Sequence, residues 1–357
     1  MREFWHGRRV LITGHTGFKG SWMCLWLHEM GADVVGYALP PSDDRGLFVQ
    51  ADVASTLSSV VGDVRNLDHL QRVVAEHRPE VVFHLAAQSL VRQSYREPVD
   101  TYATNVLGTV NMLEAVRRAR SSTAVVCITS DKCYENRETE RPYVEGDPMG
   151  GTDPYSSSKG AAELIVAAYR RSYFAPERFA EHGVALSSAR AGNVIGGGDW
   201  GADRLVVDVV ESCLRSEPPL IRNPNAVRPW QFVLEPLAGY LTLAERSWSA
   251  PVHFAEGWNF GPKLADCRPV GWVVDRITSA WGSGLGWTLD EGPRDHEAQL
   301  LLLDASKARR QLGWRPRLDL EGAIDWTVAW YRAFERGDDL RAFTEQQIAR
   351  FEVLDGG

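Results

Sequence analysis

Tyr155 and Lys159 are the residues of this chain whose types and spacing point most directly to chemistry. They lie four residues apart in a stretch that predicts a helix beginning at Pro154, and residues at this spacing share one face of a helix. An ammonium close to a phenol favours the phenolate, which lowers the Tyr pKa from about 10 toward values useful for proton transfer. With ten Tyr and only five Lys in the chain, such a pair arises by chance roughly one time in seven, so its surroundings must support it.

A second group of reactive side chains consists of Ser130, Asp131 and Lys132, which directly follow the apolar run VVCIT. This run predicts a buried parallel strand, and open α/β sheets bind ligands in the crevice outside the carboxyl ends of their strands. We therefore expect the three side chains at the mouth of a site. Because lysine is scarce here, Lys132 is a stronger functional candidate than a lysine in a lysine-rich protein.

A glycine-rich turn follows the first predicted strand, residues 8–13, and precedes an amphipathic segment that predicts a helix to about residue 30. In this order of elements, the glycines let the backbone approach a pyrophosphate at the N-terminus of the helix. We therefore predict a dinucleotide site, the alternative being an ordinary turn. The residues of the turn are Gly14, His15, Thr16, Gly17, Phe18, Lys19 and Gly20.

The choice between NAD and NADP stays open at the second predicted strand, residues 33–39. An acidic residue about twenty residues after the glycines often holds the adenosine ribose of NAD, but this chain has Tyr37, Ala38 and Leu39 there, and acidic residues follow only at 43 and 44. Lys19 or Arg45 could instead meet the 2′-phosphate of NADP.

Two further strand ends supply candidate cofactor contacts. Asp63 and Val64 end a third predicted strand, where Asp63 either reaches the adenine amine or is a solvated turn residue. Residues 80–85 predict a fourth strand, and the small residues that follow it would let a cofactor pass close to the backbone. The contacts expected there are Leu85, Ala86 and Ala87. A long helix is predicted over residues 98–118, in which Asn105 either bridges strands and helix or enters the active site.

The repeated alternation of strand and crossover over the first half predicts an α/β fold with a doubly wound parallel Rossmann sheet. After residue 190 the chain becomes rich in loops, Gly and Pro, which predicts a smaller C-terminal substrate-binding lobe. We therefore predict a cofactor domain over residues 1–190, rejoined by residues 231–258, and a lobe over residues 191–357.

Composition narrows the class of protein. A net charge of −8 argues against a general nucleic-acid binder. The five cysteines are odd in number and lack C-x-x-C spacing, so that neither a metal site nor a disulfide framework is expected. The N-terminus has no apolar signal core, and no apolar run approaches the roughly 18 residues of a membrane span, which predicts a soluble cytoplasmic protein.

Five motifs, taken in order, resemble the extended short-chain dehydrogenase/reductase family in its nucleotide-sugar-modifying branch: GHTGFKG, HLAAQSLVRQSYREPVDTYATNVLGT, TSDKCY, PYSSSK and RAGNVIGGGDW. The resemblance covers nearly the whole chain. Within this branch, the Ser-Asp-Lys triad is similar to that of the 4,6-dehydratases acting on CDP-glucose, whereas the dehydratases acting on dTDP-glucose and GDP-mannose carry Glu at the position of Lys132.

The resemblance implies an NAD-dependent dehydration of CDP-glucose, with oxidation at C4, loss of water across C5 and C6, and return of hydride to C6. It implies that Tyr155 takes the proton of the 4-hydroxyl, that Lys159 lowers the Tyr pKa and holds the nicotinamide ribose, and that Ser130 hydrogen-bonds the 4-oxygen. Lys132 would then remove the C5 proton, and Asp131 would protonate the departing 6-hydroxyl.

The same resemblance implies further contacts and an assembly. The residues expected to contact the substrate are Gln88, Asn193, Arg228, Asn259, Arg294 and Glu297. The helices near 98–118 and 155–171 supply the dimer interface of relatives, so a homodimer or a tetramer is expected. The alternatives are a nucleotide-sugar 4-epimerase, which needs no Asp-Lys elimination pair, a dehydratase acting on another nucleotide sugar, and a regulatory protein that only binds NAD.

Overall fold

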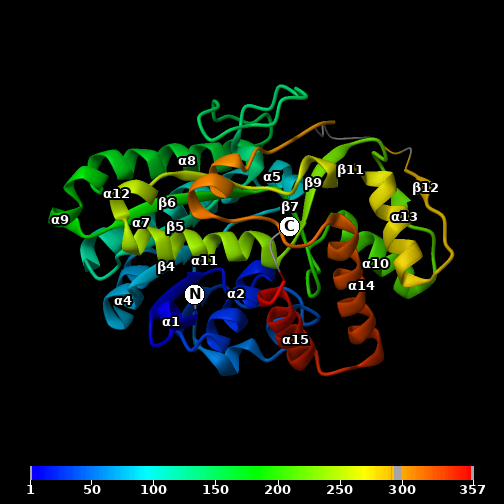
Figure 1. The fold of residues 1–357 in the computed structure, drawn as a ribbon, viewed down its shortest axis with the longest axis horizontal. Helices are drawn as coiled ribbons and strands as arrows, with labels where there is room; N and C mark the ends of the chain where they lie inside the picture. Colours follow the sequence, from blue (N-terminus) through cyan, green and yellow to red (C-terminus); the bar gives the residue numbers. More distant parts are fainter. Residues whose placement is uncertain (1, 291, 293–298, 355–357) are drawn as a thin grey trace.

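The computed structural model describes residues 2–290, 292 and 299–354, and its centre is a parallel sheet of seven strands in the order β10-β6-β5-β4-β1-β2-β3 (Figure 1). Every neighbouring pair in this sheet runs parallel. Its strands are β1 Arg9–Thr13, β2 Asp33–Ala38, β3 Ser58–Val61, β4 Val81–His84, β5 Ala124–Ile128, β6 Ala185–Ala191 and β10 Gly257–Phe260. The predicted doubly wound α/β fold is confirmed.

Helices cover both faces of this sheet, because alternate strand residues point to opposite faces and both sets are apolar. Val10 and Ile12 of β1 belong to a core that includes residues of α2 (Phe18–Glu29) and α11 (Leu234–Ser249). Leu11, between them, belongs to a second core on the other face. The helices of that second core are α4 Leu67–His77, α7 Gly108–Ala119 and α8 Pro154–Ser172.

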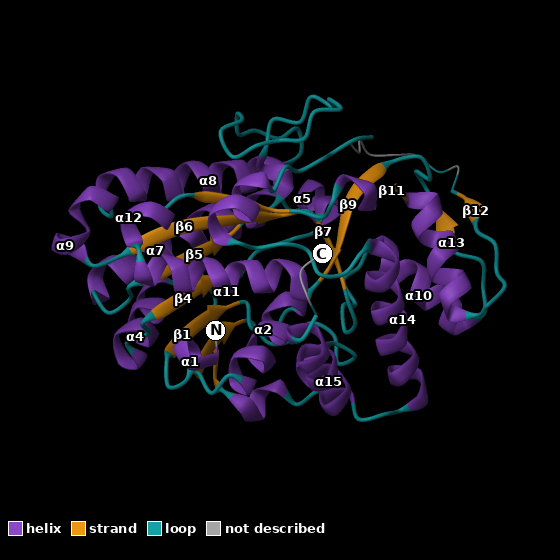
Figure 2. Cartoon of the chain, viewed as in Figure 1, coloured by secondary structure: helices purple, strands orange, loops and turns teal. Residues whose placement is uncertain are grey.

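A smaller unit built on short strands lies beside the large sheet (Figure 2). Its three-stranded sheet has the order β11-β9-β7, and a separate pair joins β8 to β12. Its strands are β7 Asn193–Ile195, β8 Leu220–Ile221, β9 Val227–Phe232, β11 Cys267–Pro269 and β12 Thr288–Leu289. Its larger helices are α10 Leu205–Arg215, α13 Val270–Trp281 and α14 Leu320–Arg336.

The chain passes between the two units more than once. The return to the large sheet begins at α11 and continues into β10, whereas Gln231 lies within β9 of the small sheet. The last helix, α15 Leu340–Glu352, packs on α2, where Trp26 Nε1 donates a hydrogen bond of 2.9 Å to Glu352. The domain boundary at residue 190 therefore stays a prediction.

Short helices complete the described chain. The region predicted as one helix over 98–118 consists of α6, a π-helical turn at Ala103–Leu107, and α7. The remaining α-helices are α1 Arg2–Trp5, α3 Leu47–Gln50, α5 Val91–Arg96, α6 Pro98–Tyr102, α9 Phe179–His182 and α12 Pro251–Phe254. Within the residues described, no helix has the length and apolar character that crossing a membrane requires.

The glycine turn between β1 and α2 leaves its backbone open to a ligand. Gly14 has a φ of +76°, and a Cβ at this position would lie 2.8 Å from the backbone nitrogen of Ala86. A Cβ at Gly20 would lie 2.2 Å from the carbonyl oxygen of Gly14. Gly17 caps α2 without a side-chain hydrogen bond, so the first amides of the helix stay available to an anion such as a pyrophosphate.

Gly20→Ala should weaken both the fold and dinucleotide binding, because its methyl group would displace the backbone of the turn. We expect a loss of about 1–3 kcal/mol in the free energy of unfolding, measured by thermal and chemical denaturation, together with weaker NAD binding by titration. Gly146→Ala is the matched control, since a Cβ there meets nothing within 4 Å. Equal stability and NAD affinity in the two variants would contradict this account of the turn.

Candidate active site

Ser130, Asp131 and Lys132 lie at the carboxyl end of β5, as their position after an apolar run predicts. Ser130 caps a short 3₁₀ turn, Asp131–Cys133, and its hydroxyl oxygen accepts a hydrogen bond of 3.2 Å from the Lys132 backbone amide. The same hydroxyl donates to Asp131 Oδ1 at 2.9 Å. The turn therefore holds a hydroxyl, a carboxyl and a half-buried amine within three consecutive residues.

Tyr155 and Lys159 lie in the first two turns of α8, which packs against this 3₁₀ turn. Asp153 caps the helix by accepting a hydrogen bond of 2.9 Å from the Ser156 amide. The Tyr155 amide donates to Ser94 Oγ at 3.1 Å, and Lys159 Nζ donates to the carbonyl oxygen of Ile128, the last residue of β5, at 3.3 Å. The structure thus brings the two predicted groups of reactive residues together.

Burial sets the protonation of the Tyr-Lys pair. It raises the pKa of the Tyr155 phenol to about 12, although a hydrogen bond with Ser130 and the charge of Arg204 act in the opposite direction. Burial also lowers the pKa of the Lys159 ammonium to about 8. The expected low Tyr pKa is therefore wrong for the protein by itself, because the loss of solvent outweighs the nearby positive charges.

Asp131 is a buried carboxyl group that is only partly compensated. Burial raises its pKa, while the charge of Lys132, the hydrogen bond from Ser130 and the charge of Arg228 oppose the increase. Its Oδ2 atom is buried and has no hydrogen-bond partner. A carboxyl group in such surroundings favours the protonated form and can act as a general acid.

Neither Lys19 nor Arg45 is placed as a free cation for a 2′-phosphate. Burial lowers the pKa of Lys19 to about 7, and the next influence is the charge of Lys159. Arg45 forms ion pairs with Asp43 at 2.6 Å and with Glu211 at 2.9 Å. These surroundings favour NAD, and contact of either side chain with a phosphate on the adenosine ribose gains no support from them.

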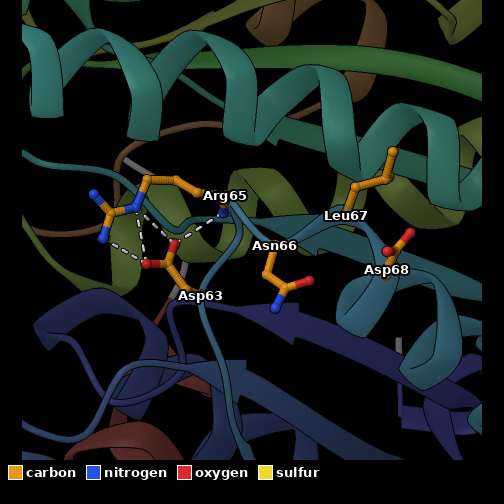
Figure 3. A pocket seen from close by; sticks show the side chains of 5 residues that line it. All are labelled: Asp63, Arg65, Asn66, Leu67 and Asp68. Atoms are coloured by element: carbon orange, nitrogen blue, oxygen red, sulfur yellow. Dashed lines mark hydrogen bonds and ion pairs between the residues drawn. The ribbon is translucent and has the colours of Figure 1, made fainter.

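Asp63 and its neighbours line a surface hollow at the end of β3 (Figure 3). The Asp63 carboxylate is paired with the Arg65 guanidinium at 2.5 Å and accepts the Arg65 amide at 2.8 Å. These hydrogen bonds lower the pKa of Asp63, so that the carboxylate is charged. Val64 beside it is buried against Gly108. Contact of Asp63 with an adenine amine stays a prediction.

The loop after β4 lies against the glycine turn. The Ala86 amide donates to Thr13 Oγ1 at 3.2 Å, which fixes the close approach of Ala86 to Gly14. The side chain of Gln88 donates to the Leu90 carbonyl and to Thr101 Oγ1, both at 3.0 Å. Its amide is thus held within the protein, and contact of Gln88 with a substrate stays a prediction.

Asn105 holds the Gln88 loop to α8 from the π-helical turn. Its carbonyl oxygen accepts the Gln88 amide at 2.9 Å, and its Nδ2 donates to the Gln88 carbonyl at 2.9 Å and to Ser158 Oγ at 2.8 Å. Of the two roles open from the sequence, the bridging one agrees with this geometry.

The remaining predicted substrate residues fall into three groups. Arg228 is buried in β9, where its charge opposes the increase in the pKa of Asp131 and its Nη1 donates a hydrogen bond of 3.2 Å to the Gln299 carbonyl. Asn193 is half-buried at the start of β7. Asn259 is fully buried and its amide forms hydrogen bonds with protein groups, so its contact with a substrate stays a prediction that this geometry does not support. The predictions for Arg294 and Glu297 lie outside the described residues.

The sequence alone did not identify two residues that lie near the catalytic residues. Arg204 is paired with Asp199 and donates to Ser89 Oγ at 2.9 Å, and its charge acts on Tyr155. Tyr240 of α11 is fully buried, and its hydroxyl lacks a hydrogen-bond partner. No local motif marks either residue, because each approaches the site from a distant part of the chain. Among the described residues, no cluster of His, Cys, Asp or Glu could hold a metal ion.

Comparisons with known proteins agree with this geometry. Residues 11–251 match the family model described as GDP-mannose 4,6 dehydratase. The chain is 49% identical over 350 residues to a CDP-glucose 4,6-dehydratase of Salmonella typhimurium, covering 98% of both chains. It is 25% identical over 336 residues to a dTDP-glucose 4,6-dehydratase of Xanthomonas campestris, covering 90% of this chain and 92% of that one.

Two solved structures show the same fold. A UDP-glucose 4-epimerase of Thermotoga maritima superposes with a TM-score of 0.80 at 24% identity, covering 92% of this chain and 99% of that one. A dTDP-glucose 4,6-dehydratase of Bacillus anthracis, in complex with NAD, superposes with a TM-score of 0.77 at 21% identity, covering 93% and 99%. The chain belongs to the GDP-mannose 4,6-dehydratase family.

Proposed function

We propose that this protein catalyses the NAD-dependent dehydration of CDP-D-glucose to CDP-4-dehydro-6-deoxy-D-glucose. The observation that carries the proposal is the 3₁₀ turn at β5, which sets a buried carboxyl group, Asp131, and an amine, Lys132, beside the Tyr155–Lys159 face of α8. The Salmonella typhimurium relative, named for CDP-glucose and similar over nearly its full length, supports this choice of substrate.

The first step needs a group that takes a proton from the sugar 4-hydroxyl. Tyr155 has this role, with Ser130 hydrogen-bonded to the 4-oxygen and Lys159 on the nicotinamide ribose. The glycine turn would hold the pyrophosphate of NAD, which when bound would supply the hydride acceptor for C4 and the hydride donor for C6. Because the site is buried, a proton held on Tyr155 is shielded from exchange with bulk solvent.

The second step is an elimination that uses the 3₁₀ turn. The ketone formed at C4 acidifies the C5 proton, which Lys132 removes. Asp131 donates its proton to the departing 6-hydroxyl, so that water leaves across C5 and C6. The raised pKa of Asp131 suits this role, because a carboxyl group must be protonated before it can act as an acid.

A 4-epimerase has less support. Its reaction needs the Tyr, Lys and Ser but no acid and amine at the 3₁₀ turn, and the likeness to solved epimerases concerns the fold alone. A regulatory protein that only binds NAD would not need the reactive groups, all of which are present and close together.

We also propose a cytoplasmic homodimer. The adjoining helices α6 and α8 and the π-helical turn expose large apolar side chains, among them Val99 at 81%, Leu107 at 57% and Leu164 at 62% exposure. Such a face is suited to a second copy, since exposed apolar clusters mark interfaces.

The substrate proposal is tested by incubating the purified protein and NAD with CDP-glucose and, in parallel, with dTDP-, GDP- and UDP-glucose and GDP-mannose. Mass spectrometry should find a product lighter by one water from CDP-glucose, formed much faster than from the others. A product of unchanged mass would identify an epimerase instead. Equal rates with several bases would contradict the choice of CDP-glucose.

Lys132→Met should leave NAD binding and oxidation at C4 in place and abolish elimination, because the thioether cannot accept the C5 proton. We expect a loss of at least about 100-fold in kcat, within the range of general base catalysis, and loss of deuterium exchange at C5. Lys263→Met is the matched control, since Lys263 is exposed on a loop. Full dehydration by the Lys132 variant would contradict the assigned role.

Asp131→Asn should lose activity but gain thermal stability. Burial raises the folded pKa of this carboxyl above its usual value near 3.9, so ionisation costs stability as the pH rises from that value through the folded pKa. The Tm of the variant should therefore exceed that of the wild type at neutral pH, and the difference should shrink toward pH 4. A variant that is less stable at every pH would contradict a raised pKa.

A further inference from the structure

Glu163 of α8 and Arg190 of β6 form a buried ion pair behind the catalytic group. Arg190 Nη2 lies 2.8 Å from Glu163 Oε2, and its Nε donates to Oε1 at 2.9 Å. Only 4% of Glu163 and 5% of Arg190 side-chain surface is exposed. The bidentate geometry makes this a rigid link between a helix and a strand.

The ion pair holds one residue on each side of the 3₁₀ turn and its Ser130 cap. On one side of the turn, Thr129 Oγ1 donates to Glu163 Oε1 at 2.5 Å. On the other side, Arg190 Nη1 donates to the Tyr134 hydroxyl at 2.7 Å. Since Ser130, Asp131 and Lys132 lie between Thr129 and Tyr134, the ends of the catalytic turn are fixed to one pair of charges.

Glu163, one member of the ion pair, lies on α8, the helix that carries the other catalytic residues. Glu163 follows Lys159 by one helical turn and Tyr155 by two, so the three side chains lie along one face of α8. A shift of this helix against the sheet would move Glu163 away from Arg190 and Tyr155 away from Ser130 together. The pair therefore couples the positions of the two halves of the site.

Stability alone does not account for such a pair. A buried ion pair costs several kcal/mol of desolvation per charge, and apolar residues of similar volume often stabilise a fold as well or better. Here the carboxylate accepts a further hydrogen bond of 2.8 Å from Ser188, and the Tyr134 hydroxyl donates to Asn259 Oδ1 at 2.7 Å, which extends the network to β10. The network specifies one geometry among β5, β6, β10 and α8.

We propose that Glu163 and Arg190 are positioning residues that hold the Tyr155–Lys159 face of α8 in register with the Ser130–Lys132 turn, so that oxidation and elimination act on the same bound sugar. This inference rests on the proposed dehydration. Oxidation at C4 uses Tyr155 with Ser130, and elimination uses Lys132 with Asp131. Loosening the register leaves the oxidised sugar poorly placed for elimination, and it escapes before water is lost.

The test measures which product leaves the enzyme. Tyr134→Phe removes the hydrogen bond to the turn and leaves the ion pair in place; Glu163→Gln removes the charge and keeps the side-chain shape. With CDP-glucose and NAD, we expect both variants to release a sugar nucleotide lighter by two hydrogens at about ten times or more its wild-type proportion, alongside the product lighter by one water. Glu163→Asp, which keeps the charge, should fall between wild type and Glu163→Gln.

The proportion of the two products does not depend on how much of a variant is folded, so it separates positioning from stability. Val116→Ala is the stability control, because Val116 is fully buried in α7 and belongs to the second apolar core, which includes none of the catalytic residues named above. It should lower Tm and leave the product proportion unchanged. Variants of Tyr134 and Glu163 that keep the wild-type proportion would overturn the inference. A wild-type enzyme that releases no dehydrated product would overturn the proposed function instead.

Discussion

The constraint on which the rest of the structure depends is the burial of a parallel sheet on both faces. Val10 and Ile12 face one apolar core and Leu11 the other, so helices must cover both sides and no face is left for a ligand. Ligands can then approach only at the edges, and the parallel order brings the ends of β1, β4 and β5 to the same edge. The glycine turn and the Ser130–Lys132 turn therefore face one crevice.

Withdrawal from solvent is the main electrostatic influence in that crevice. It shifts Tyr155, Lys159, Lys19 and Asp131 toward their neutral forms. Neutral amines can accept protons and neutral carboxyl or phenol groups can donate them, so a buried site already holds groups prepared for proton transfer in both directions. Glu163 is the exception, because Arg190 and the hydroxyl donors Thr129 and Ser188 outweigh the cost of burial and lower its pKa. Glu163 therefore stays charged in the ion pair that links α8 to β6.

The smaller unit completes the site from one side. Arg204 reaches from the start of α10 to Ser89 of the large unit, and Arg228 of β9 lies near Asp131. These guanidinium groups are positive charges next to a catalytic carboxyl group in a protein of net charge −8. They suit an anionic substrate such as a nucleotide sugar, because guanidinium binds phosphate oxygens bidentately. The net negative charge of the chain therefore does not extend to these two positions beside the catalytic carboxyl group.

The sequence by itself determined the elements whose signals are local. Apolar runs marked the strands, the glycines marked the turn that a Cβ would block, and the spacing of Tyr155 and Lys159 marked a shared helix face. Tertiary structure decided what depends on distant partners. Only packing shows that the side-chain amides of Gln88 and Asn259 form hydrogen bonds within the protein. It also shows that Arg45 is paired with an acidic residue, and that Arg204 and Tyr240 approach the site. Hydrogen bonds and desolvation depend on residues that are close in space but distant in sequence, so the order of residues along the chain does not predict them.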